Sequence, residues 1–193
     1  GTLSGSGTSY TAVFTPTANS NVNGVISVAD TKFTNAAGNT NTDSGDDNNT
    51  KTITVDTRRP TIAITSDVSS LKAGETATIT FTISESVTDF AFADITVTSG
   101  GSLGTLSGSG TSYTAVFTPT ASSTANGVIS VADTKFTDAA GNTNADSGDA
   151  NNTSTITVDT VLPTLLSAET ADNNGDGTVD RLVLTFSEQV DLT

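Results

Sequence analysis

Oxygen-bearing side chains recur at alternate positions in the segment 172–180, which reads DNNGDGTVD. Three evenly spaced oxygen ligands repel one another unless a cation bridges them. Ligands of this hard type suit Ca²⁺, and a glycine after the third one allows the sharp turn that a metal loop needs. The sequence therefore predicts a calcium loop with the ligands Asp172, Asn174, Asp176, Thr178 (through its carbonyl) and Asp180.

The elements around this loop distinguish it from an EF-hand. An EF-hand carries Glu at position twelve and is flanked by helices, whereas Val183 stands at that position and the run RLVLTF is typical of a strand. We therefore expect a calcium loop within a β-hairpin. The equivalent segment Leu71–Ala77 keeps the turn glycine but lacks the ligands, and an ordinary Asn/Gly-rich turn without metal remains the alternative.

Composition limits the other chemistry that the chain can perform. The net charge is −14, and there is no Cys, His, Met or Trp. The charge argues against binding to nucleic acid or to an anionic membrane. The missing residue types exclude the common nucleophile–base pairs and nitrogen or sulfur zinc sites. We expect no enzyme and no catalytic residues. A glycosidase-like carboxylate pair stays open as an alternative, although short loops leave little room for a cleft and we expect no carboxylate to be buried.

An internal repeat organises the whole chain. The segment Gly1–Ala18 recurs letter for letter at Gly104–Ala121, an offset of 103 residues, and 52 of the 61 positions in 1–61 match their partners in 104–164. This period is too long for a solenoid unit and matches a complete β-sandwich domain.

Within one period the hydrophobic pattern predicts strands only. Apolar residues alternate with Thr in Thr76–Ser84, and similar runs occur at Thr61–Ser66, Ser112–Thr118, Gly127–Asp133 and Thr153–Val158. Turn dipeptides separate these runs, and no stretch has a helical period. We therefore predict an all-β fold of tandem immunoglobulin-like β-sandwich domains.

Linker prolines give the predicted domain boundaries. Pro60 and Pro163 each follow an Asp-Thr-x-x linker, and Pro suits a stiff linker or the start of an edge strand. Residues 56–159 would then be one complete repeat, 1–55 the C-terminal part of the preceding repeat, and 160–193 the N-terminal part of the next. Either the two partial sandwiches belong to a longer ordered chain, or they complete one another between molecules.

A second group of candidate ligands depends on this topology. The end of the second strand, the sixth-to-seventh loop and the inter-domain linker of such a sandwich lie at one pole, so we expect the acidic residues there to converge and to bind Ca²⁺ at the domain junction. The alternative is that each is a solvated surface charge or a turn cap. The candidates are Asp56, Glu85, Asp138 and Asn142 at the first junction, and Asp159 and Glu188 at the next.

Three segments resemble the bacterial Ig-like repeats of large, repetitive surface adhesins: Arg59–Glu85, Ser112–Ala121 and Phe136–Asn142 (FTDAAGN). Many members of that family are secreted by the type I route and act in biofilms. The resemblance covers essentially the whole chain, including RTX-adhesin-like extender features, and it implies an extracellular or cell-surface location.

The resemblance implies a spacer that carries distal binding domains away from the cell, with neighbouring repeats as its partners and calcium as the stiffening ion. Two alternatives remain open: a glycan- or cell-surface-binding module, which would show clustered exposed aromatic rings, and a subunit of an extracellular filament in which copies of the chain complete one another by strand exchange.

Overall fold

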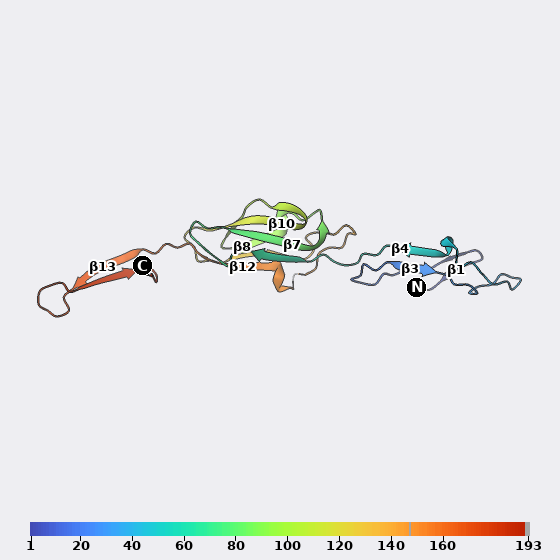
Figure 1. The fold of residues 1–193 in the computed structure, drawn as a ribbon, viewed down its shortest axis with the longest axis horizontal. Helices are drawn as coiled ribbons and strands as arrows, with labels where there is room; N and C mark the ends of the chain where they lie inside the picture. Colours follow the sequence, from blue (N-terminus) through green and yellow to red (C-terminus); the bar gives the residue numbers. More distant parts are fainter. Residues whose placement is uncertain (147, 192–193) are drawn as a thin grey trace.

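A computed structural model describes residues 1–146 and 148–191. Figure 1 shows a central sandwich, with an N-terminal unit on one side and a C-terminal hairpin on the other, along one long axis. None of the helices in these residues is long and apolar enough to cross a membrane. The predicted all-β fold is confirmed, since helical structure in the described residues is confined to three short 3₁₀ turns: η1 (Asp47–Asn49), η2 (Phe92–Asp94) and η3 (Ala150–Asn152).

Two four-stranded sheets form the central sandwich. The first sheet has the order β5-β7-β10-β9 and the second has the order β6-β12-β11-β8. The pairings are antiparallel except that β6 runs parallel to β12. The strands are β5 (Ile62–Ser66), β6 (Ser70–Lys72), β7 (Ala77–Val87), β8 (Ile95–Ser99), β9 (Gly101–Leu103), β10 (Ser107–Pro119), β11 (Gly127–Val131) and β12 (Thr153–Asp159).

The core lies between these sheets and follows from the alternation of apolar residues along each strand. In β7 the apolar positions are buried and the Thr positions between them are exposed or half-buried, as expected for a pleated strand with one face on the core. Phe90 joins the sheets at one end, with its ring centroid 5.1 Å from that of Tyr113 and 5.3 Å from that of Phe136. Removing these side chains from water provides the main stabilisation of the sandwich.

The flanking units are smaller. The N-terminal unit contains the pairs β1–β2 and β3–β4, and the C-terminal unit is the single hairpin β13–β14. Their strands are β1 (Ser4–Ser6), β2 (Ser9–Thr11), β3 (Gly24–Ser27), β4 (Thr50–Ile53), β13 (Leu165–Ala171) and β14 (Arg181–Phe186). Two-stranded sheets alone bury little apolar surface.

Candidate metal centre at the first linker

The linker that leads into the central sandwich holds Asp56 in a defined position. The next residue, Thr57, donates its hydroxyl to the Thr17 carbonyl at 2.7 Å and accepts the Ser20 N–H at 2.9 Å. The Arg58 N–H donates to Asp56 Oδ1 at 3.2 Å. These bonds anchor the linker to the N-terminal unit and leave Asp56 exposed at the junction.

A tight loop of the sandwich positions Asp138. Its Oδ1 accepts the N–H groups of Ala140 and Asn142, each at 2.8 Å, and its Oδ2 accepts the Asn142 side-chain amide at 2.7 Å. Gly141 has a φ of +89°, a left-handed conformation that strains any residue with a Cβ. Asp138 is consequently buried, with 6% of its surface exposed.

Glu85 lies near the end of β7, beside the residue that ties this strand to the linker. Ser84 Oγ accepts the Thr61 N–H at 2.9 Å, and the Ser84 N–H donates to the Thr61 carbonyl at 2.9 Å. This pair of bonds closes the linker onto β7. Glu85 is half-buried next to it.

The structure brings these three carboxylates together. Asp56, Glu85 and Asp138 each offer an oxygen, and the three oxygens lie within 4.8 Å of one another. In residues 1–146 and 148–191, this is the one group of three or more acidic side chains with such spacing. Asn142, the fourth residue predicted here, donates its amide to Asp138 and, at 3.1 Å, to the Asp56 carbonyl. It therefore faces the group with its nitrogen and acts as a clamp between loop and linker.

The electrostatics of this group favour a positively charged ligand. Burial raises the pKa of Glu85, and the negative charges of Asp138 and Asp56 raise it further, while the charge of Arg58 lowers it. Burial also works to raise the pKa of Asp138, but the hydrogen bonds from Asn142, Ala140 and Gly141 outweigh it and hold that pKa below its usual value. In the described part of the chain the one ion pair is Lys72–Glu75, at 3.5 Å. Arg58 thus influences the group at a distance without pairing with it.

The second linker repeats the backbone bond of the first, and its two candidate ligands have separate surroundings. The Val161 N–H donates to Asp159 Oδ1 at 3.2 Å, as Arg58 does at the first linker. Glu188 has a buried Oε1 without a hydrogen-bond partner among the described residues. Within residues 1–146 and 148–191, neither belongs to a group of three or more closely spaced carboxylates.

The loop at 172–180 has its acidic side chains folded onto its own backbone. Asp172 accepts the N–H groups of Gly175 and Gly177 at 2.7 and 2.8 Å, and Asp176 accepts the N–H and the hydroxyl of Thr178. The hydrogen bond from Gly177 lowers the pKa of Asp172, and the Thr178 hydroxyl lowers that of Asp176. Asp180 Oδ1 accepts the Asn173 N–H at 3.0 Å. The loop is thus curled by bonds to its own backbone, although its three Asp side chains do not meet the spacing of the linker group.

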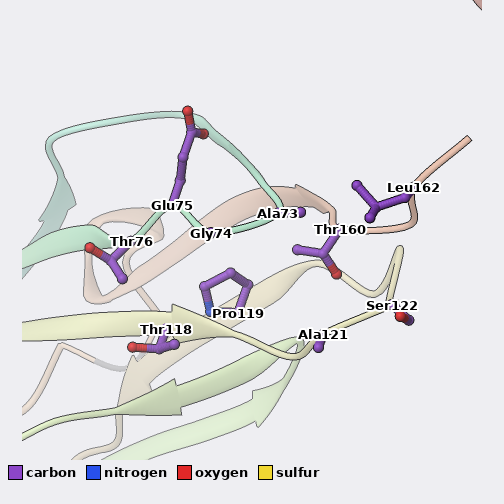
Figure 2. Close-up of a pocket in the computed structure, with 10 residues that line it drawn as sticks. All are labelled: Ala73, Gly74, Glu75, Thr76, Thr118, Pro119, Ala121, Ser122, Thr160 and Leu162. Carbon is purple, nitrogen blue, oxygen red and sulfur yellow. The ribbon is translucent and has the colours of Figure 1, made fainter.

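Two shallow grooves lie near the second linker. Figure 2 shows the first, of about 380 Å³, between the Gly74 turn and the end of β10, with Leu162 of the linker at its edge. Glu75 is the one acidic residue that lines it. The second groove, of about 400 Å³, has Lys72, Glu75 and Asp159 in its lining, and Lys72 is the ion-pair partner of Glu75.

The burial of one further acidic residue was not predicted, and the expectation that no carboxylate is buried was wrong. Besides Asp138, Asp146 is only 6% exposed, because its Oδ2 accepts the N–H of Ile62 at the start of β5. Its Oδ1 has no hydrogen-bond partner among the described residues. The segment 146–152 had no signal for this burial, since the donor lies 84 residues away in the sequence.

Most aromatic side chains in the central sandwich are buried in its core. Phe92 is exposed, at 51%, whereas the other five aromatic residues of the range 56–159 are buried. These are Phe81, Phe90, Tyr113, Phe117 and Phe136. The clustered exposed rings expected of a glycan-binding module do not occur in the described residues of this sandwich.

The sequence profile of the bacterial Ig-like domain family matches residues 1–52 and 56–155. The chain therefore belongs to the bacterial Ig-like domain family. Domains of this family are usually extracellular or surface-exposed. Neither a curated protein nor a solved structure matches the chain.

Proposed function

We propose that this chain is a spacer segment in the stalk of a large bacterial cell-surface or secreted adhesin, and that calcium stiffens it at the domain junctions. The carboxylate group of Asp56, Glu85 and Asp138 is the observation that carries the proposal. Near-verbatim repetition of sequence in units that lie along one axis supports a mechanical role (Figure 1).

A cation at the first linker would relieve a cost that the fold otherwise carries. Three carboxylates in one place repel one another, and burial together with the negative charges of Asp138 and Asp56 raises the pKa of Glu85. Carboxylate oxygens are the ligands that Ca²⁺ prefers, and backbone carbonyls and water can fill its remaining positions. Extracellular modules bind calcium at about 10⁻⁴–10⁻³ M, so the ion would load outside the cell.

The position of the three residues explains how an ion would stiffen the stalk. Asp56 belongs to the linker, whereas Glu85 and Asp138 belong to the sandwich. An ion shared by all three would fix the linker to the pole of the domain and add to the bond between Asn142 and the Asp56 carbonyl. Bending at the junction would then require breaking metal–oxygen contacts.

The hairpin loop supplies a second calcium site in this proposal. Asp172, Asn174, Asp176 and Asp180 are already held in a curled loop by backbone hydrogen bonds. The turn glycine has nearly the same φ as its counterpart in the central sandwich, +85° at Gly177 and +84° at Gly74. Both loops thus turn at a glycine in the left-handed region, and the acidic ligands are an addition in the third unit.

The test combines calorimetric titration with thermal unfolding, in calcium and in chelator. The informative variant is Asp138→Asn, because Asn35 stands at the equivalent position of the first unit and accepts the same two N–H bonds at 3.0 Å. The turn is therefore expected to survive while one charge is lost. Asp47→Ala is the matched control, since the equivalent residue of the second repeat is Ala150.

We expect calcium to raise the melting temperature of the parent and of Asp47→Ala, and to raise that of Asp138→Asn less, with one fewer site by titration. Asp172→Asn combined with Asp176→Asn should remove the other site. Equal melting temperatures with and without calcium, with no heat of binding, would contradict the proposal.

A further inference from the structure

The loop that closes the hairpin β13–β14 contains a dipeptide with reactive potential. Asn174 is followed by Gly175, and the same dipeptide occurs at Asn23–Gly24 and Asn126–Gly127. An Asn side-chain amide that precedes glycine can be attacked by the next backbone nitrogen, because glycine has no Cβ to obstruct the approach. The three pairs have the same two residues, so their surroundings decide which of them reacts.

The backbone has more room at Gly175 than at the other two glycines. Gly175 has a φ of +73°, and a Cβ placed there would meet no atom within 4 Å. Gly24 and Gly127 are the first residues of β3 and β11, and a Cβ there would lie 2.3 and 2.5 Å from a phenylalanine ring. The nitrogen of Gly175 therefore has space to approach the Asn174 side chain, whereas the other two glycines are held in sheets against a ring.

A carboxylate lies on the hydrogen of the attacking nitrogen. The Gly175 N–H donates to Asp172 Oδ1 at 2.7 Å. A carboxylate in this position orients the nitrogen and can take its proton when the nitrogen forms a new bond, which is the role of a general base. Asp172 thus has a second possible role besides that of a metal ligand.

Asp176 holds the two ends of the amide under attack. Its backbone N–H donates to Asn174 Oδ1 at 3.0 Å, so a donor already points at the oxygen that gains negative charge, as in an oxyanion hole. Its Oδ2 accepts the Asn174 side-chain N–H at 3.0 Å, which places a carboxylate beside the departing nitrogen. In contrast, Asn23 Oδ1 accepts the distant Val55 N–H at 3.2 Å. The bonds around Asn174 all lie within residues 172–176, so they do not depend on what surrounds the hairpin.

We propose that Asn174 is a site of self-catalysed deamidation. The Gly175 nitrogen bonds to Asn174 Cγ and loses its proton to Asp172, while the Cγ–Nδ2 bond breaks. The departing nitrogen takes a proton from water and leaves as ammonia, and Asp172 returns its proton to the solvent. A water molecule then opens the cyclic imide to aspartate or isoaspartate, which adds a negative charge to the loop. The reaction needs only water, so the inference does not depend on the proposed function.

The test follows the three Asn-Gly pairs in the same sample. The 193-residue chain is incubated in chelator at neutral pH, and peptide mass spectrometry measures the deamidated fraction at each Asn over time. Asp172→Asn removes the proposed base. Asp180→Asn is the matched control, because it removes the same charge from the same loop, whereas Asp180 accepts the Asn173 N–H and bonds to none of the reacting atoms.

We expect Asn174 to deamidate at least about ten-fold faster than Asn126, which has the same neighbour in a strand. Asp172→Asn should slow the reaction at Asn174 by about ten-fold or more, and Asp180→Asn should leave its rate unchanged. A rate at Asn174 no greater than that at Asn126 would overturn the proposal. So would equal rates in the two variants, because Asp172 would then not promote the reaction.

Discussion

The two linkers of this chain share one backbone frame and differ in charge. Thr57 and Thr160 each donate to a carbonyl at 2.7 Å and each accept a serine N–H at 2.9 Å. The residues between Thr and Pro are Arg58–Arg59 in the first linker and Val161–Leu162 in the second. The hydrogen-bonded frame fixes where the linker runs, and the variable pair decides what electrostatic environment the junction offers.

The acidic residues also differ between the two linkers. At the first linker, three carboxylates converge and Arg58 moderates their repulsion from a distance. At the second linker, Asp159 and Glu188 belong to no such group among the described residues, and the linker adds exposed apolar side chains. Under the proposed function, the first junction is the stronger calcium site.

Replacing Glu85 by Gln should have the largest effect of the substitutions considered. The sign of its effect on the melting temperature should depend on whether calcium is present. Losing a ligand should weaken calcium binding at the first linker by about ten- to a hundred-fold. In chelator the same substitution removes a repelled, half-buried charge, so the melting temperature should rise. Thermal unfolding in both conditions measures this crossover. A variant that is less stable than the parent in both would show that Glu85 serves packing alone.

Thr160→Ala should destabilise the central sandwich by about 1–2 kcal/mol, because it removes a buried hydroxyl that accepts one N–H and shares its hydrogen between two carbonyls. Thr57→Ala is the matched substitution at the first linker, where the residue is half-buried, and it should cost less. Chemical denaturation of both variants measures the difference. Equal losses in the free energy of unfolding would mean that the two threonine hydroxyls stabilise their linkers equally in spite of their different burial.

In chelator, the effect of Glu85→Gln on the melting temperature should depend on pH. The folded state raises the pKa of Glu85, so this residue contributes stability below its unfolded pKa and loses that contribution as the pH rises through the folded pKa. The advantage of the Gln variant should therefore be present at neutral pH and vanish on acidification. Melting temperatures of parent and variant, measured in chelator across this range, test the sign.

Arg58→Val should tighten calcium binding at the first linker about two- to five-fold, since a positive charge near the group is removed. This substitution also converts the residue to its counterpart Val161. The gain should shrink at high salt, which screens exposed charges. Titration at two ionic strengths checks it, and an unchanged affinity would show that Arg58 does not influence the site.

Much of the architecture could be predicted from the sequence. The repeat gave the size of the unit, and alternating apolar residues gave the strands, because a period of two directly reports a strand with one buried face. The convergence of Asp56, Glu85 and Asp138 also followed from topology, since all three lie at one pole of a sandwich. The short strand β6 and its parallel pairing with β12 were not predicted, because three residues are too few for a periodic signal.

Burial of acidic side chains could not be predicted in the same way. Asp138 and Asp146 are buried because backbone N–H groups point at them, those of Ala140 and Asn142 in one case and that of Ile62 in the other. Such donors become visible only when the path of the backbone is known. The orientation of Asn142, which presents its nitrogen to Asp56 and Asp138, depends on the same local geometry.

Pulsed electron-spin distance measurement across each linker tests the stiffened-stalk account most directly. The absence of native Cys allows labels at Lys51 and Thr155 for the first junction, and at Thr155 and Glu169 for the second; all three positions are exposed. The account predicts that calcium narrows the distance distribution across the first linker and narrows the distribution across the second linker less. In the Asp138→Asn variant, calcium should hardly change the distribution across the first linker. Distributions across the first linker that superimpose in calcium and in chelator would contradict it.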